Sequence, residues 1–161
     1  YAITIAPSSH WDLVDCIAVV ETSHKTIGST DGHKAAGSSP LQAARVKDTE
    51  RRLDLCRSAI LQHDFDALSR ILELDSNLLH AVALTSNPAI YYWLPATLAI
   101  MQAVITWRKS GLPVAFTIDA GPNVHVICEE ESKTLLIEKL THIEGVQQVI
   151  ASGVGAGARL V

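Results

Sequence analysis

The sequence lacks the features by which proteins commonly bind nucleic acids or enter membranes. Aromatic residues make up only 5% of its 161 residues, and charge is mildly acidic and well mixed, with a formal net charge of −4. Without a basic patch or an aromatic stacking platform, we expect no nucleic-acid partner. The longest apolar runs are interrupted well before the length of a membrane span, so we also expect no membrane partner.

Cysteine and histidine are present, but not at the spacings of metal ligands. Cys16, Cys56 and Cys128 form no CxxC pair, and two of them sit in apolar runs. We interpret all three as reduced core residues of a cytoplasmic protein. The seven histidines show neither HExxH nor a mixed Cys/His pattern, so we expect no protein-bound zinc.

The remaining composition predicts one domain over residues 1–161 with a substantial core, because 48% of the residues are hydrophobic. Strands are expected at 13–20, 114–118, 124–128 and 146–151, and residues 1–5 alternate like another strand. Helices are expected at 41–63, 65–84, 95–109 and 130–142, with a break near His63. Residues 21–39 are expected to be mostly loop, with room for one helical turn. This order predicts an α+β fold, an antiparallel sheet packed against helices.

The most informative stretch is 116–127, where an apolar strand ends at Asp119 and another begins after a short turn. Gly121 allows a close approach or a positive φ, and Pro122 fixes its own φ. A carboxylate held at such a loop edge is well placed for catalysis. From the residues alone, an ordinary hairpin whose Asp119 caps its own turn explains the pattern equally well.

Three further segments carry recognisable patterns. They are Ser29-Thr30-Asp31-Gly32-His33 with the later Ser38-Ser39-Pro40-Leu41, then Asp75-Ser76-Asn77-Leu78-Leu79-His80, and the glycine-rich 153–160. Together with Asp119-Ala-Gly-Pro-Asn123, and in the order in which they follow one another along the chain, these segments resemble mevalonate diphosphate decarboxylases of the GHMP kinase superfamily. The resemblance fits the C-terminal half of such an enzyme. It implies a GHMP kinase C-terminal fold and a missing N-terminal ATP-binding domain, and a chain that starts at Tyr1 agrees with that expectation.

The resemblance implies a lyase of the mevalonate pathway of isoprenoid biosynthesis. ATP would phosphorylate the 3-hydroxyl of mevalonate 5-diphosphate, and loss of that phosphate with CO2 would give isopentenyl diphosphate. The implied cofactors are ATP and Mg²⁺, the ion being held mainly by ATP phosphates and the missing domain. A cytoplasmic homodimer is implied as well, and the fragment alone is expected to be inactive.

Site residues follow from the matched positions. Asp119 matches the catalytic aspartate that accepts or orients the 3-hydroxyl proton. Ser29 matches the serine that hydrogen-bonds the substrate, and Thr30 and Gly32 would add donors around an anion. His33 stands where the family usually has Met, and it is either a specificity residue or a neutral variant.

Other residues are assigned more loosely. Asn123 is placed at the substrate site, where it would tie the signature turn together. Ser76, Asn77 and His80 would line the substrate or form structural hydrogen bonds to the Ser29 loop. Lys25 is either a phosphate contact or a solvated surface residue.

Three alternatives remain open. The enzyme could decarboxylate mevalonate 5-phosphate to isopentenyl phosphate, or it could be a kinase that stops after phosphorylation. The chain could instead be a non-catalytic α+β ligand-binding domain, in which the motif residues only stabilise turns. Geometry separates this last alternative, which predicts no shared cleft for Ser29 and Asp119.

Overall fold

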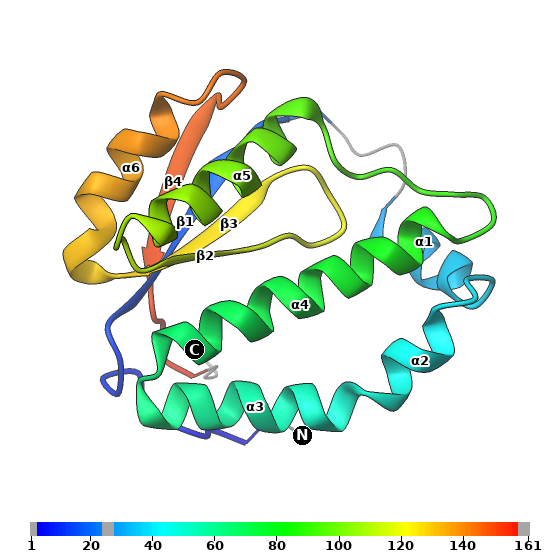
Figure 1. Cartoon of the computed structure of the whole chain (residues 1–161), viewed down its shortest axis with the longest axis horizontal. Coiled ribbons are helices and arrows are strands. Elements are labelled where there is room, and N and C mark those ends of the chain that lie inside the picture. The colour runs from blue at the N-terminus through cyan, green and yellow to red at the C-terminus, as the bar shows by residue number, and fades with distance from the viewer. Residues whose placement is uncertain (1–2, 24–27, 158–161) are drawn as a thin grey trace, which may run out of the picture.

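Four short strands rich in β-branched residues form the central sheet of this computed structural model, which describes residues 3–23 and 28–157 (Figure 1). They are β1 (Leu13–Val19), β2 (Val114–Thr117), β3 (Val124–Glu129) and β4 (Gln148–Gly153). The sheet has the order β2-β3-β1-β4, and each neighbouring pair is antiparallel. The predicted α+β fold with an antiparallel sheet is therefore confirmed.

Helices pack on one face of this sheet and along its β2 edge. They are α1 (Ser29–Ala36), α2 (Gln42–Lys47), α3 (Thr49–Gln62), α4 (Phe65–Leu84), α5 (Pro95–Lys109) and α6 (Lys133–Thr141), the last preceded by the 3₁₀ turn η1 (Glu130–Ser132). Local signals fix several ends. The Asp64 carboxylate accepts the N–H of Ala67 at 2.8 Å at the start of α4. Gly111 takes a φ of +94° after the end of α5, as a residue at that position should.

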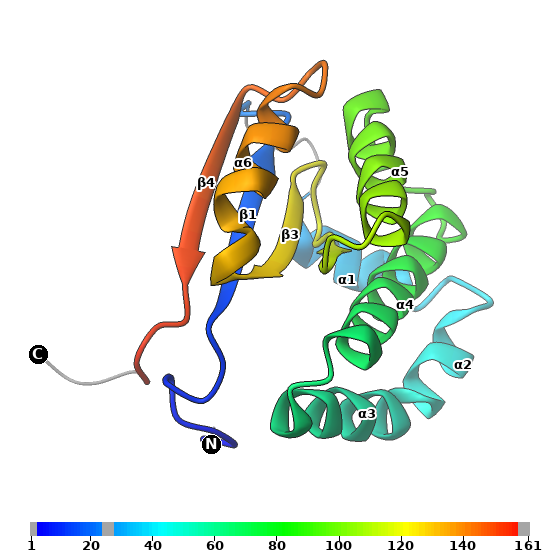
Figure 2. The ribbon, with the colours of Figure 1, turned by 60° about the vertical axis from the view of Figure 1, so that its left-hand side comes forward.

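The main core lies between one face of the sheet and helices α5 and α6 (Figure 2). Alternation along β1 turns Val14, Cys16 and Ala18 toward these helices, while the residues between them are only half-buried. The helices contribute the fully buried residues Ile100, Val104, Leu136 and Leu140.

Helix α4 covers the outer edge of the sheet at β2. The backbone N–H of Phe116 donates to the Glu73 carboxylate at 3.4 Å, and that of Ile118 donates to the Ser76 hydroxyl at 3.0 Å. An edge strand leaves such groups unpaired, so side chains of α4 satisfy them. A smaller apolar cluster around Trp11 and Leu68 packs α3 against α4.

Several expectations about local structure were wrong or inexact. Residues 21–39 contain the two-turn helix α1, where the Ser- and Gly-rich composition predicted mostly loop and one helical turn at most. The single helix expected over 41–63 is two helices that meet at Asp48. Residues 3–5 form no strand, and β4 begins at Gln148, two residues later than expected.

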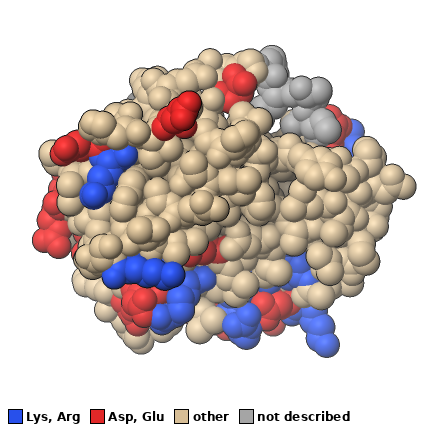
Figure 3. Space-filling model, turned by 45° about the horizontal axis from the view of Figure 1, so that its top comes forward, with Lys and Arg blue, Asp and Glu red and all other residues tan. Residues whose placement is uncertain are grey.

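The surface agrees with the mixed charge of the sequence. On the face shown in Figure 3, acidic and basic side chains gather toward the edges and lie near one another, and most of the middle carries no charge. Among residues 3–23 and 28–157, no helix is long and apolar enough to span a membrane. The three cysteines are free thiols, and Cys16 and Cys128 are fully buried core residues as expected, whereas Cys56 is only half-buried at the edge of a smaller apolar cluster.

Candidate active site

Asp119 lies two residues past the end of β2, and helix α4 fixes Ile118 between them. The Ser76 hydroxyl lies 3.0 Å from the Ile118 nitrogen and 3.3 Å from its carbonyl oxygen. His80, one turn further along α4, donates from Nε2 to the same carbonyl at 3.3 Å. Both side chains are almost completely buried, so their hydrogen bonds to Ile118 fix the end of the strand opposite one turn of α4.

The turn after Asp119 is held by two further elements. The buried Thr97 hydroxyl, in the first turn of α5, donates to the Pro122 carbonyl at 2.6 Å. The Asn123 side-chain oxygen accepts the backbone N–H groups of Val20 and Glu21, at 2.9 and 3.1 Å, just past the end of β1. The turn is thus anchored at both ends, while Asp119 itself stays exposed.

Helix α1 faces Asp119 across a cavity of about 240 Å³. Ser29, Gly32, His33 and Ala36 all line this cavity. Their spacing of i, i+3, i+4 and i+7 places them on one face of the helix. We call this space the Asp119 cavity.

Tyr92 closes one side of the Asp119 cavity. A Cβ atom added to Gly32 would come within 2.6 Å of the Tyr92 hydroxyl, so the absence of a side chain at Gly32 lets this hydroxyl lie against α1. Burial raises the pKa of Tyr92, and the nearby carboxylates of Asp119 and Asp31 raise it further. The hydroxyl therefore keeps its proton at neutral pH and remains a hydrogen-bond donor.

His80 is neutral behind the cavity. Burial lowers the pKa of its imidazole, and the Ile118 carbonyl and Asp119 only partly oppose that effect. The ring packs against Trp93 at 4.9 Å and edge-on to Tyr92 at 5.8 Å between ring centroids. His80 therefore serves here as a buried support with its donor directed at Ile118.

Helix α2 brings two polar residues to the Asp119 cavity that the sequence motifs did not mark. Gln42 and Arg45 are three positions apart and line it together. The Arg45 guanidinium also lies 3.8 Å from the Asp75 carboxylate. The only sequence signal was their shared helical face, which does not by itself distinguish them from surface residues.

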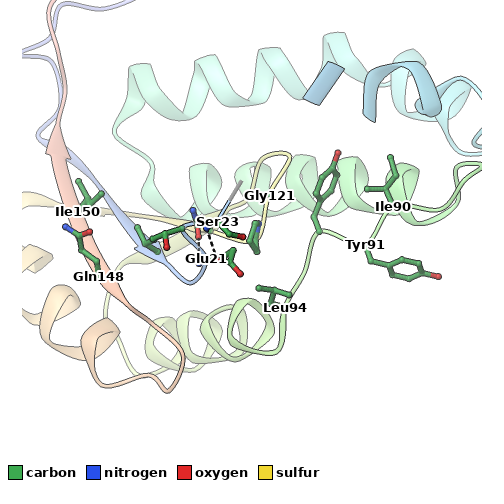
Figure 4. A pocket seen from close by; sticks show the side chains of 13 residues that line it. Glu21, Ser23, Ile90, Tyr91, Leu94, Gly121, Gln148 and Ile150 are labelled. Atoms are coloured by element: carbon green, nitrogen blue, oxygen red, sulfur yellow. Dashed lines mark hydrogen bonds between the residues drawn. The ribbon is translucent and has the colours of Figure 1, made fainter. Parts of the chain in front are cut away.

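A second cavity, of about 590 Å³, adjoins the same turn (Figure 4). Gly121, Pro122 and Asn123 line it together with residues from β4 and from the segment between α4 and α5. Tyr92 borders both cavities. At the rim, the backbone N–H of Ser23 donates to Glu21 at 2.8 Å and lowers the pKa of that carboxyl.

Comparison with protein families shows to which family this chain belongs. Residues 16–158 match the family model described as the mevalonate 5-diphosphate decarboxylase C-terminal domain. The chain belongs to the mevalonate 5-diphosphate decarboxylase family. The resemblance inferred from the sequence motifs is confirmed.

Individual relatives agree with the family. The chain is similar to diphosphomevalonate decarboxylase of Ganoderma lucidum, with 36% identity over 85% of this chain and 36% of that protein. It is also similar to phosphomevalonate decarboxylase of Haloferax volcanii, with 30% identity over 87% of this chain and 41% of that protein. A solved structure of the mevalonate diphosphate decarboxylase from Enterococcus faecalis superposes with a TM-score of 0.82 at 28% identity, over 94% of this chain and 46% of that one. The chain therefore spans less than half the length of these relatives.

The structure brings together only part of the residue set expected from the decarboxylase motifs. Ser29, Gly32, His33 and Asp119 line one cavity. Thr30 is exposed on α1 and does not line the Asp119 cavity.

The remaining expected residues lie around that cavity. Asn123 ties the turn, as expected, but borders the second cavity. Ser76 and His80 bond to Ile118 instead of the Ser29 loop, and Asn77 is exposed on α4. Lys25 lies outside the described residues.

A protein-bound metal is not indicated in the described part of this decarboxylase domain. Over residues 3–23 and 28–157, no group of three or more His, Cys, Asp or Glu side chains is placed to hold an ion. The Asp119 carboxylate and the Ser29 hydroxyl are among the oxygen donors of residues that line the Asp119 cavity.

Proposed function

We propose that the complete protein catalyses the ATP-dependent decarboxylation of mevalonate 5-diphosphate to isopentenyl diphosphate. The substrate's 3-hydroxyl oxygen bonds to the γ-phosphorus of ATP as the bond to ADP breaks. The C3–O bond then breaks with phosphate as leaving group, and the C–C bond to the carboxylate breaks to release CO2 and leave a double bond. Phosphorylation is needed because hydroxide is a poor leaving group.

The observation that carries this proposal is the shared cavity of Ser29 and Asp119 in a chain of this family. The Asp119 carboxylate accepts or orients the proton of the 3-hydroxyl as that oxygen attacks. Ser29, at the first position of α1, donates a hydrogen bond to an anionic group of the substrate near the positive end of the helix dipole. A non-catalytic ligand-binding domain gives no reason for Ser29 and Asp119 to share a cavity.

ATP and Mg²⁺ belong to the proposal as co-substrate and its counter-ion. The Enterococcus faecalis decarboxylase binds ATP in a manner mediated by mevalonate diphosphate. Mg²⁺ commonly keeps phosphate oxygens as ligands, which fits a domain whose described residues place no group of three or more His, Cys, Asp or Glu side chains to hold an ion. It would neutralise charge on the transferred phosphoryl group.

Mevalonate 5-phosphate is the second candidate substrate. The phosphomevalonate decarboxylase of Haloferax volcanii is among the relatives, and His33 lines the Asp119 cavity where the family usually has Met. Measuring CO2 release from both substrates side by side distinguishes the two. Release only from the monophosphate would make His33 the specificity candidate, and release from the diphosphate would make it a tolerated variant.

The test of the catalytic role is Asp119→Asn in the complete protein. Amide in place of carboxylate removes the proton acceptor while keeping the size of the side chain. Turnover should fall by at least about 100-fold, the usual contribution of a general base. CO2 release would be followed with ATP and Mg²⁺ present. Asp31→Asn is the matched control, because Asp31 is an exposed acid on α1 that does not line the cavity.

The outcomes are distinct. Near-normal turnover in Asp119→Asn would refute the assignment of Asp119. Phosphorylated product without CO2 from the wild-type protein would instead indicate a kinase that stops after the first step.

We further propose that this domain works beside an N-terminal nucleotide-binding domain, in a cytoplasmic homodimer. Support for the first part comes from the relatives, of which this chain matches less than half. Support for the dimer and the location is the family resemblance. Sedimentation of the complete protein tests the assembly, and a single-protomer mass over micromolar concentrations would reject it.

A further inference from the structure

Buried polar atoms without partners gather in the Asp119 cavity. Among residues 3–23 and 28–157, five buried side-chain polar atoms have no hydrogen-bond partner. Three of the five belong to residues that line this cavity, namely Gln42 Oε1, Arg45 Nε and Tyr92 Oη. Native proteins leave few such atoms unsatisfied because each one costs stability. Arg45 Nε and Tyr92 Oη are donors, so their concentration beside Asp119 indicates a ligand with acceptor oxygens. The acceptor Gln42 Oε1 would need a donor, such as a hydroxyl of the same ligand.

Arg45 supplies a positive charge to this cavity that its neighbours do not fully cancel. Among residues 3–23 and 28–157, the carboxylate that forms an ion pair with it is that of Asp75, at 3.8 Å from Nη2. Asp75 is bound more closely by Arg52, whose Nε lies 2.9 Å away. A guanidinium has donors on several edges, so contact with Asp75 at one nitrogen leaves others for a ligand.

Gln42 and Tyr92 add neutral polar groups to the lining of the Asp119 cavity beside Arg45. Gln42 begins α2 one turn before Arg45, and its side-chain amide carries donors as well as the buried oxygen. Tyr92 adds a hydroxyl donor that lies against Gly32 of α1. A charged donor flanked by neutral donors is the usual composition of a site for a carboxylate or a phosphate.

We propose that Arg45, with Gln42 and Tyr92, forms a subsite beside Asp119 that binds an anionic group of the substrate. This inference rests on the proposed function, whose substrates carry a carboxylate at one end and phosphate at the other. Arg45 holds that anion so that the 3-hydroxyl lies at Asp119. The chemistry shared by the two anions is bidentate binding to a guanidinium.

The test measures ligand binding to the complete protein by calorimetry without ATP, so that no turnover occurs. Arg45→Gln should weaken binding of mevalonate 5-diphosphate by about tenfold or more, because hydrogen bonds to charged groups are the strong ones. Isopentenyl diphosphate separates the two anions, since it has the diphosphate and lacks the carboxylate. Weakening for both ligands would assign the subsite to phosphate, and weakening for mevalonate 5-diphosphate alone would assign it to the carboxylate.

Matched controls guard against a structural explanation. Arg57→Gln removes a half-exposed arginine of α3 outside the cavity and should leave both affinities unchanged. Asp75→Asn removes the Arg45 ion pair but keeps the guanidinium, so binding should be retained. Tyr92→Phe should weaken binding severalfold, whereas Tyr91→Phe, at a residue 77% exposed, should not.

Two results would overturn the subsite. One is unchanged affinity for both ligands in Arg45→Gln and Tyr92→Phe, and the other is an equal loss in Asp75→Asn, which would make Arg45 a structural residue only. If these occur while the wild-type protein still releases CO2 with ATP and Mg²⁺, the proposed function stands without the subsite. Wild-type protein that neither binds mevalonate 5-diphosphate nor releases CO2 from it would overturn both.

Discussion

His80 combines deep burial with a titratable ring directly behind Asp119. It is 1% exposed, and its imidazole donates to the Ile118 carbonyl. Burial lowers the pKa of this ring in the folded protein below its ordinary value. As pH falls, the unfolded chain therefore takes up the proton before the folded chain does. The free energy of unfolding is fully retained above an ordinary pKa of about 6.5 and decreases below it.

This argument predicts a specific change in His80→Gln. Glutamine can still donate to Ile118 but does not titrate, so the loss of stability between about pH 7 and pH 5 should become shallower than in the wild-type protein. Urea unfolding at several pH values measures the slope. His142→Gln, at an exposed histidine after α6, should leave the slope unchanged. A slope identical in His80→Gln and wild type would contradict the assignment of the pH dependence to His80.

At the scale of elements, helix α4 positions Asp119 through the sheet edge that it covers. Ser76 satisfies the N–H and carbonyl of Ile118, and Glu73 reaches the N–H of Phe116 one pleat earlier. Glu73 is itself fixed by Arg108 of α5, whose two nitrogens lie 2.5 and 2.8 Å from its oxygens. Helices α4 and α5 therefore hold β2 in place together, and these contacts determine where Asp119 lies.

Ser76→Ala should release the end of β2 from α4. The substitution leaves the buried N–H of Ile118 unsatisfied, which costs about 1–3 kcal/mol of the free energy of unfolding. Ser69→Ala is the matched control, because Ser69 is equally buried on α4 but donates within its own helix to Asp66. Urea unfolding measures stability, and hydrogen exchange reports on the Ile118 amide. If the Ile118 amide exchanged no faster in Ser76→Ala than in Ser69→Ala, this role of Ser76 would be refuted.

The elements also show what the sequence could predict. Periodicity and capping signals gave α4 and α5 at their observed bounds, because long apolar stripes and residues such as Asp64 and Gly111 act locally. Helix α1 was missed because its cavity face carries Ser29, Gly32 and His33 instead of an apolar stripe, and none of its residues is buried. The family motifs found Asp119 and Ser29 but not Arg45 or Tyr92, whose meeting depends on how α2 and the segment after α4 pack.

At the scale of the whole molecule, the proposed site is open. Asp119, Ser29 and His33 are all exposed, and the second cavity adjoins the same turn. The proposed reaction requires water to be excluded and a nucleoside triphosphate to be held, which needs walls and phosphate donors beyond those that the described residues present around Asp119. Since the relatives are more than twice as long as their match to this chain, the rest of the protein is the natural source of those walls.

The isolated chain should therefore fold but release no CO2 from mevalonate 5-diphosphate with ATP and Mg²⁺. Folding is expected because β1 to β4, α5 and α6 enclose a continuous core of their own, and circular dichroism with a cooperative melt would check it. The complete protein assayed in parallel is the control. Adding the preceding half as a separate polypeptide should restore part of the activity, because the two halves then rebuild the cavity walls. Turnover by the purified isolated chain would show that this domain carries its own nucleotide site, and the two-domain proposal would have to be abandoned.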